Sequence, residues 1–442
     1  MPWFCLEASA LTDQQIGSAV LRLLDEARTR INPDLKRVLL LPPDLTRAHS
    51  GAGKITELLY QALPNADVAV IPTLGQHRPH TEEENRWMFG SIPNTKIEAH
   101  DWRNGVTRLG TIPSALVAET TGGVADWEIP VSLNSTLMAN KWDLVVNIGH
   151  VVPHEVLGFA NHNKNYFIGL GGHDTICASH IAAAVYGIEN NLGCLIAPLR
   201  ACYNWAEQHF LGYLPDVYVQ IVMRRDEQNR LVPCGIYVGD DLETYLAAAR
   251  RSRELNVAVF DTSVTKIVAV MQADEFRSMW VSNKAVYRTR MAIADGGDLL
   301  IIAPGLDRFG EQPEVDALIR KYGYTGTQHL FGLYKTKADM QAAPHGVAHL
   351  IHGSSEGRFT IRYAPGHLTR TEIEQVGYQY ADFAEAQARY PPDKMLEGWN
   401  TMPSGEQVYY ISTPSAGLWS TKAMLTNPSR RDLVDGFAKT TR

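Results

Sequence analysis

The sequence KRVLLLPPDLTR, at positions 36–47, decides the predicted fold because an apolar run leads directly into a polar loop. The pattern recurs at 66–72 (ADVAVIP), which leads into GQHRP at 75–79, and at 143–148 (DLVVNI). Short, continuous apolar runs are typical of strands buried on both faces of a parallel sheet. The sequence therefore predicts an α/β fold. In such sheets ligands bind where the polar loops follow the carboxyl ends of the strands.

A second α/β pattern begins near residue 256, with a helix predicted at 274–293 and a strand at 349–355 (HLIHGSS). We therefore expect two α/β domains with mainly parallel sheets flanked by helices. The active site is predicted in the cleft between the domains. The predicted ranges are 1–248, completed by 411–442, for the N-terminal domain and 249–410 for the C-terminal domain that closes over the substrate.

Composition narrows the class of protein. The chain has 442 residues, 45% of them apolar, so it can bury a large core. Its formal net charge of −7 argues against nucleic acid or an anionic membrane as partner. No apolar run approaches the ~20 residues that cross a bilayer, and the N-terminus lacks the features of a signal peptide. The five cysteines form no CxxC pair, so we expect reduced thiols and a cytoplasmic location.

The segment HEVLGFANHNKNYFIGLGGHDTICASH, at 154–180, concentrates polar chemistry after the third apolar run. It contains four histidines and one lysine. A buried segment can satisfy so many imidazoles and amides only with a ligand or a dense hydrogen-bond network. Histidine exchanges protons near neutral pH and also binds metals. The segment therefore predicts acid–base or metal chemistry.

Short motifs stand in a characteristic order in and before this segment. They read Asp-Leu-Thr-Arg at 44–47, Gly-Gln-His-Arg-Pro at 75–79, and then Pro153-His154, Gly158-Phe159, Lys164, Thr175-Ile176 and Ser179-His180. With these motifs the chain resembles the nickel-pincer lactate racemase family. The resemblance implies an isomerase, a racemase or epimerase that inverts C2 of a 2-hydroxy acid by reversible hydride transfer. It also implies nickel, held in a nickel-pincer nucleotide (pyridinium-3,5-bisthiocarboxylic acid mononucleotide nickel).

The resemblance implies a role for each matching residue. Lys164 would carry the cofactor covalently and His180 would bind its nickel. His77 and His154 would be paired acid–base catalysts, which suits a reaction that needs a base for the hydroxyl proton on each face of the substrate. The other predicted contacts are Asp44, Thr46, Gly171, Gly172 and Thr175 to the cofactor, and Arg47, Lys284 and Trp280 to the substrate. Arg47 suits a carboxylate because its planar guanidinium can bind both oxygens.

Departures from the family pattern bear on the substrate. Asn161, His162 and Asn163 stand where the family has Gly-Gly-Arg before the lysine, Asn165 follows it, and Trp280 replaces a tyrosine. Unpaired amides in a pocket built for a methyl group would cost about 1–3 kcal/mol each. We therefore predict a sugar acid or a longer 2-hydroxy acid rather than lactate. In the alternative interpretation the asparagines only fix the loop, and the substrate is a short hydroxy acid.

Two other functions stay open on the sequence. One is a metal-dependent hydroxy-acid lyase or dehydratase that uses the same histidines, and the other is a non-catalytic carrier of the nickel cofactor. A carrier would need only Lys164 and His180, so His77 and His154 argue against it. Non-functional interpretations also exist, such as a structural ion pair for Arg47. As partners we expect the small-molecule substrate, cofactor-biosynthesis enzymes and a second copy of the chain in a homodimer.

Overall fold

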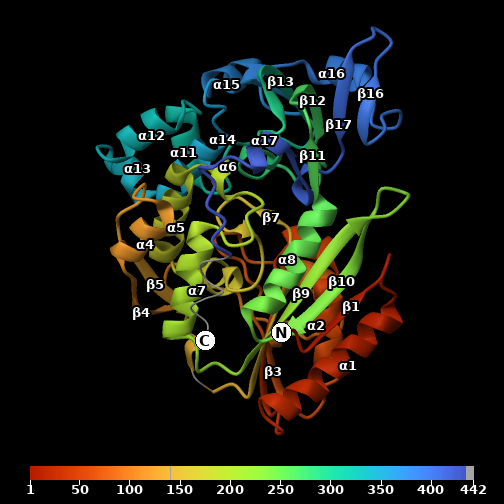
Figure 1. Cartoon of the computed structure of the whole chain (residues 1–442), viewed down its shortest axis with the longest axis vertical. Helices are drawn as coiled ribbons and strands as arrows, with labels where there is room; N and C mark the ends of the chain where they lie inside the picture. The colour runs from red at the N-terminus through yellow and green to blue at the C-terminus, as the bar shows by residue number, and fades with distance from the viewer. Residues whose placement is uncertain (140, 435–442) are drawn as a thin grey trace. The chain divides into compact units, whose positions relative to one another are not determined.

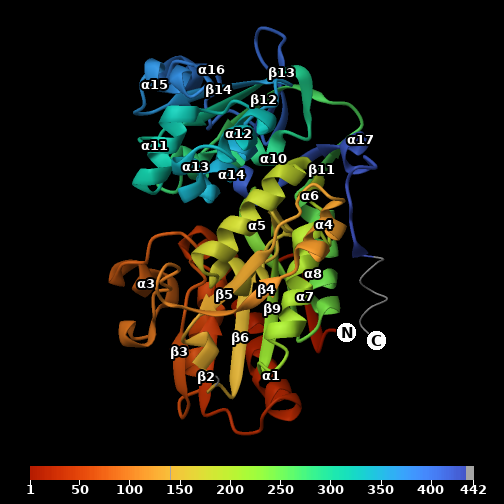
Figure 2. The same cartoon turned by 90° about the vertical axis from the view of Figure 1, so that its left-hand side faces the viewer.

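A computed structural model describes residues 1–139 and 141–434, which divide into two compact units (Figures 1 and 2). The first unit comprises Met1–Ala178, Leu195–Leu255 and the described residues from Asp432 on. The second comprises Ser179–Cys194 and Asn256–Arg431. Residues 411–431, predicted to complete the N-terminal domain, therefore lie in the second unit. The predicted mixed α/β class with mainly parallel sheets is confirmed; the predicted cleft stays a prediction.

The first unit is built on a six-stranded sheet in the order β1-β10-β9-β6-β2-β3. Strands β9, β6, β2 and β3 run parallel, whereas β10 and β1 are added antiparallel at one edge. The bounds are β1 (Phe4–Glu7), β2 (Arg37–Leu41), β3 (Asp67–Val70), β6 (Leu144–His150), β9 (Asp216–Arg225) and β10 (Leu231–Gly239). The three apolar runs of the sequence are thus the adjacent strands β2, β3 and β6.

Helices bury one face of this sheet. Apolar side chains of α1 (Asp13–Arg30), α2 (Ala52–Gln61) and α3 (Glu82–Phe89) share a core with alternate residues of the strands. Reciprocal side-chain caps start α1 at Thr12 and α3 at Thr81. The unit also contains β4 (Val106–Ile112), α4 (Ser114–Thr121), β5 (Ile129–Asn134), α7 (Pro198–Phe210) and α8 (Leu242–Asn256).

The second unit has its own six-stranded sheet, in the order β15-β14-β13-β12-β17-β16, with only β16 antiparallel to its neighbour. The strands are β12 (Val264–Val270), β13 (Ile293–Ala303), β14 (Thr360–Pro365), β15 (Gln379–Tyr380), β16 (Gly398–Thr401) and β17 (Gln407–Ile411). A separate parallel pair joins β11 (Val257–Phe260) to β18 (Leu418–Thr421). These pairings hold the strands near 411 and 418 in this unit.

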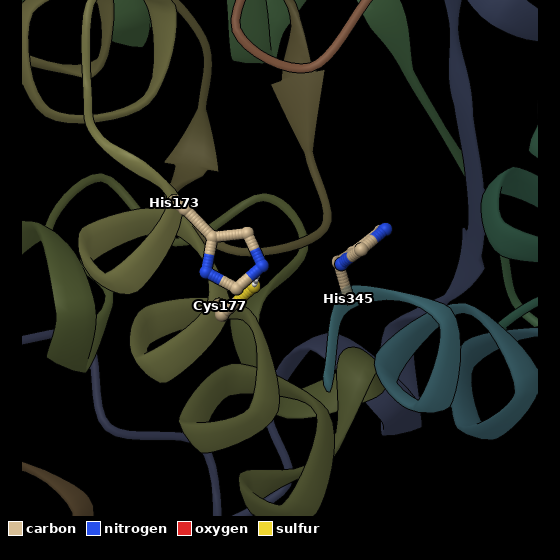
Figure 3. Close-up of side chains that lie close together, drawn as sticks. All are labelled: His173, Cys177 and His345. Carbon is tan, nitrogen blue, oxygen red and sulfur yellow. Dashed lines mark hydrogen bonds between the residues drawn. The ribbon is translucent and has the colours of Figure 1, made fainter. Parts of the chain in front are cut away.

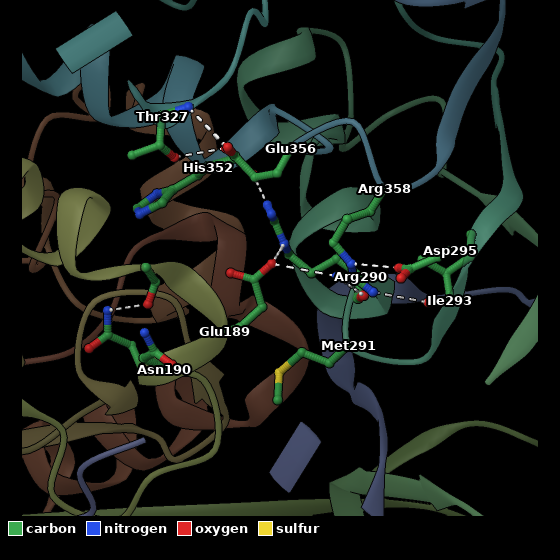
Figure 4. Close-up of polar contacts among 12 residues, drawn as sticks. Glu189, Asn190, Arg290, Met291, Ile293, Asp295, Thr327, His352, Glu356 and Arg358 are labelled. Carbon is green, nitrogen blue, oxygen red and sulfur yellow. Dashed lines mark hydrogen bonds and ion pairs between the residues drawn. The ribbon is translucent and has the colours of Figure 1, made fainter. Parts of the chain in front are cut away.

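The segment Ser179–Cys194 belongs to the second unit through a buried ion pair (Figure 4). Arg290 is 1% exposed, and it donates to the carboxylate of Glu189 at 2.6 Å and to the carbonyl of His352 at 2.8 Å. Arg358 lies 3.9 Å from the same carboxylate. Glu189 is on α6 (Ile188–Asn191), so the pair fixes the chain that follows α5 (His173–Tyr186).

Two local predictions in this unit are wrong. The predicted strand at 349–355 falls largely in helix α14 (Pro344–Gly353), where three histidines recur at helical spacing and Pro344 occupies the first turn. The predicted helix at 274–293 is two short helices, α9 (Met279–Ser282) and α10 (Lys284–Thr289), because β13 already begins at Ile293. The other helices are α11 (Pro313–Tyr322), α12 (Thr327–Tyr334), α13 (Ala338–Ala342), α15 (Arg370–Gln375), α16 (Phe383–Arg389) and α17 (Lys422–Leu425). Among residues 1–139 and 141–434, no helix is both long and apolar enough to cross a bilayer.

Candidate active site

Three predicted site residues follow adjacent parallel strands of the first unit. Asp44 follows β2, His77 follows β3, and His154 ends β7 (Pro153–His154), which comes directly after β6. Because β2 pairs with both β3 and β6, the three loops leave the sheet at the same edge. A backbone bridge between Pro43 and Thr73 also ties the first two loops together.

A buried carboxylate connects these loops. Asp44 accepts a hydrogen bond from Nδ1 of His77 and another from the hydroxyl of Thr46 at 2.7 Å. Burial alone would raise the pKa of Asp44. The charge and hydrogen bond of His77, the Thr46 hydroxyl and the Lys164 ammonium outweigh it and hold that pKa well below its usual range. Asp44 is therefore ionised, and it interacts with three other predicted site residues, Thr46, His77 and Lys164.

The two predicted acid–base histidines have opposite tautomers. An ionised carboxylate only accepts hydrogen bonds, so Nδ1 of His77 carries a proton and Nε2 of the neutral ring has a lone pair. In His154, Nδ1 accepts the backbone N–H of Val156 at 3.2 Å, so the proton of the neutral ring is on Nε2. At Nε2, the neutral His77 ring can therefore accept a proton, whereas the neutral His154 ring donates a hydrogen bond.

His80 supports the Asp44 loop, although no sequence pattern pointed to it. Its Nε2 accepts the backbone N–H of Leu45 at 3.1 Å, and its Nδ1 donates to the side-chain oxygen of Asn85 at 3.1 Å. Burial lowers the pKa of His80, so the neutral ring that this pair of bonds requires is favoured. The only indication of this role in the sequence is that His80 stands three residues after His77, at the end of the same loop.

Lys164 follows two residues with left-handed backbone, Asn161 (φ 66°) and His162 (φ 57°). Such φ values are unfavourable for residues other than glycine. The side chain of Asn161 offsets part of this cost through hydrogen bonds to other residues of the chain. Asn161 donates to Gln220 Oε1 at 2.7 Å and to the carbonyl of Gly149 at 3.0 Å. Lys164 then begins a short π-helical turn at Asn165–Gly169.

Asn163 and Asn165 are bonded within the protein in the same way. Asn165 donates to Asn147 Oδ1 at 2.7 Å, and Asn163 donates to Asn204 Oδ1 at 2.7 Å and to Glu207 at 2.9 Å. These contacts match the alternative interpretation, in which the asparagines fix the loop. They remove the amide groups as a reason to expect a sugar acid.

Packing explains the glycines that follow this loop. A Cβ on Gly171 would lie 2.1 Å from the carbonyl oxygen of Phe167, and one on Gly172 would lie 2.9 Å from Cβ of Ser132. The N–H of Gly172 donates to the Ser132 carbonyl at 2.8 Å. The hydroxyl of Thr175 accepts the Ser132 N–H at 2.9 Å. Because these groups already bond within the chain, their predicted role in holding the cofactor stays a prediction.

The remaining predicted residues divide between the units. Arg47 lies on the short helix Leu45–Ser50 of the first unit, whereas His180, Trp280 and Lys284 belong to the second. Trp280, on α9, stacks on His349 of α14 with ring centroids 4.6 Å apart. The roles of these four residues toward substrate and metal stay predictions.

Further potential metal-binding side chains lie on α5 and, separately, on α14 (Figure 3). On α5, Nε2 of His173 is 3.6 Å from Sγ of Cys177, one turn later, and His173 stacks on Trp102 with ring centroids 5.4 Å apart. His345 stands at the start of α14 in the second unit. Imidazole and thiol groups suit a soft metal, so His173 and Cys177 are candidates that no sequence motif identified.

The first unit is thus an α/β domain whose candidate site combines the ionised Asp44 with His77 and Lys164 at the carboxyl ends of parallel strands, with His154 following the neighbouring strand. Residues 7–191 match the family described as the lactate racemase N-terminal domain. The match covers the N-terminal part of the chain, and the predicted resemblance to lactate racemases is confirmed.

Individual relatives agree with this assignment. A lactate racemase of Thermoanaerobacterium thermosaccharolyticum is 24% identical over 260 residues, which are 56% of this chain and 54% of that protein. The crystal structure of a Thermotoga maritima protein has the same fold, with a TM-score of 0.78, 23% identity, and coverage of 94% of this chain and 100% of that one. The lactate racemase apoprotein of T. thermosaccharolyticum also shares the fold, with a TM-score of 0.67, 17% identity, and coverage of 91% and 92%.

Proposed function

We propose that this chain is a racemase or epimerase that inverts C2 of a 2-hydroxy acid with a nickel-pincer nucleotide attached to Lys164. The observation that carries the proposal is the ionised Asp44, bonded to His77 and within electrostatic reach of Lys164, in a domain of the lactate racemase family. A carrier protein would have no use for an oriented, proton-accepting histidine beside the attachment lysine.

The residues present fit the cofactor. Lys164 supplies an amine for a covalent bond, and the neighbouring Asp44 carboxylate offers an acceptor for the cofactor's donor groups. His180 supplies an imidazole, a ligand type that nickel accepts. When bound, the nickel-pincer nucleotide supplies the acceptor that takes hydride from C2 of the substrate and returns it.

The chain's own residues handle the charge and the hydroxyl proton. Arg47 binds the substrate carboxylate through its planar guanidinium, and Lys284 adds a second positive charge. Nε2 of the neutral His77 ring takes the hydroxyl proton of one enantiomer, and a protonated His154 ring returns a proton from Nε2 when the other enantiomer forms. In the reverse direction the two histidines exchange roles.

The substrate class is a 2-hydroxy acid. We keep a sugar acid or longer hydroxy acid as the proposed substrate on the strength of Trp280 alone, whose flat ring can stack against sugar C–H groups. Chain produced together with cofactor-biosynthesis enzymes should be offered single enantiomers of lactate, a bulkier 2-hydroxy acid and an aldonate. The products should then be separated by chiral chromatography. Inversion of at least one supports the proposal, and fast racemisation of lactate without turnover of the aldonate would exclude the sugar-acid assignment.

Intact mass completes the test. Wild-type protein should exceed its sequence mass by the nucleotide, and Lys164→Ala should lack the increment and the activity. An unmodified wild-type protein that inverts its substrate at full rate would contradict the proposed attachment.

A further inference from the structure

We propose that Arg200, on α7, is a positioning residue that directs Lys164 toward the cofactor by clamping the loop in front of it. The proposal rests on the proposed function, in which Lys164 is the attachment point. It concerns a residue that lies 36 positions further along the chain and touches neither substrate nor cofactor in that function.

Arg200 is a fully buried cation whose hydrogen bonds go to a single loop. Its side chain is 0% exposed. One terminal nitrogen donates to the carbonyl of Phe159 at 2.6 Å, and the other donates to the carbonyl of Asn161 at 3.1 Å and to Oδ1 of Asn163. The guanidinium carbon also lies 4.5 Å from the ring centroid of Tyr245. Burying a cation is costly. Because the three acceptors of this guanidinium are uncharged and lie in one loop, we infer that Arg200 stabilises the conformation of that loop.

The bonded loop contains the unfavourable backbone. The carbonyl oxygens of Phe159 and Asn161 flank the start of the left-handed pair Asn161–His162. Arginine can hold both carbonyls at once because its donors project in a rigid fork, which a lysine ammonium lacks. Without the fork, the carbonyls of Phe159 and Asn161 lose their hydrogen bonds to Arg200, and a return of the left-handed pair to negative φ would change the direction in which the next residues leave the loop.

Asn163 connects the Arg200 hydrogen bonds to the position of Lys164, the next residue. Because arginine only donates hydrogen bonds, Oδ1 of Asn163 must face Arg200, and its amide nitrogen then faces Asn204 and Glu207. The side chain is therefore held on both sides. The backbone carbonyl of Asn163 accepts the N–H of Phe167 at 3.0 Å, which begins the turn that contains Lys164. Lys164 is thus fixed between a clamped residue and a hydrogen-bonded turn.

The test compares Arg200→Ala and Arg200→Lys with wild type in the full-length protein. Arg290→Lys is the matched control, because it changes another buried arginine, in the second unit. In apo-protein, the rate at which an N-hydroxysuccinimide ester of acetate modifies Lys164 is measured by peptide mass spectrometry relative to the exposed Lys36. In protein made with the cofactor enzymes, intact mass gives the loaded fraction, and turnover is expressed per loaded chain.

We expect both Arg200 variants to acetylate faster at Lys164 and to lose about tenfold in loading or turnover, the scale usual for residues that orient a functional ligand. Added guanidinium ion should restore part of the loss in Arg200→Ala but not in the control. Arg290→Lys should lower the melting temperature without changing acetylation of Lys164.

A folded Arg200→Ala protein with wild-type acetylation, loading and turnover would overturn the proposal. If Arg200→Ala does not fold, Arg200→Lys decides in the same way, because it keeps the charge and removes the fork. If wild-type protein never gains mass at Lys164, the proposed function fails, but the acetylation rates still show whether Arg200 positions the lysine.

Discussion

Replacing Asp44 by asparagine removes the charge that orients His77 and keeps the size of the side chain. A hydrogen bond to a charged group contributes about 1.5–3 kcal/mol, against about 0.5–1.5 kcal/mol for a neutral one. The His77 side chain is 37% exposed and Asp44 only 9%, so water screens the pair and the lower end of the difference applies, about 1 kcal/mol. The amide can also donate to Nδ1 of His77, which would place the proton on Nε2 and remove the base. We therefore expect kcat to fall between about fivefold, from the lost charge, and ~10²-fold, from the lost base.

The assay is turnover per cofactor-loaded chain, with the inversion of each enantiomer measured separately. Asp143→Asn is the matched control, since Asp143 accepts the backbone N–H of Arg37 at 2.8 Å at the opposite end of β2. The control should keep wild-type kcat. If Asp44→Asn also keeps wild-type kcat in both directions, Asp44 does not orient a catalytic base, and the proton-transfer roles proposed for His77 and His154 are wrong.

Three further variants test the energetics of the fold. Burial raises the pKa of Asp216 to about 7, so from pH 4 to 7 the folded protein retains a proton that the unfolded chain releases. The free energy of unfolding should therefore fall by about 1.4 kcal/mol per pH unit as the pH rises, and urea denaturation of Asp216→Asn should show a flatter profile. Arg290→Met should cost about 3 kcal/mol because it breaks a buried ion pair and leaves the Glu189 carboxylate with the more distant Arg358, 3.9 Å away, and adding Glu189→Leu should recover much of the loss. Gly169→Ala should lower the free energy of unfolding, measured by urea denaturation, by about 1–3 kcal/mol, since the new Cβ would lie 2.5 Å from Cβ of Thr73. An unchanged free energy of unfolding would show that the backbone moves enough to remove this clash.

The parallel sheet of the first unit could be predicted because its signal is local. Strands β2, β3 and β6 are continuous apolar runs, and their order along the chain places Asp44, His77 and His154 after neighbouring strands. The pairing of Asp44 with His77 follows once both loops leave the same edge. The contact of Asp44 with the cofactor stays a prediction, whereas its hydrogen bond to His77 could not be predicted, because no local pattern links residues 33 positions apart.

Side-chain direction and long-range packing could not be predicted. The amide of Asn163 faces Arg200 and Glu207, which are distant in sequence, so the composition of the loop alone suggested a polar pocket. The segment Ser179–Cys194 joins the second unit through the pair Glu189–Arg290, which links residues 101 positions apart. The segment HLIHGSS was predicted as a strand on only two consecutive apolar residues, Leu350 and Ile351, and so short a run fits either period.

The most direct test of the central claim is inversion in D2O. Cofactor-loaded protein is incubated with one enantiomer of lactate and, separately, of a longer 2-hydroxy acid. Chiral chromatography with mass spectrometry then reports both the configuration and the deuterium content at C2. The proposed hydride transfer predicts that the opposite enantiomer forms with the original hydrogen retained at C2. Inversion with deuterium incorporated at C2, or no inversion of any 2-hydroxy acid by fully loaded protein, would contradict it.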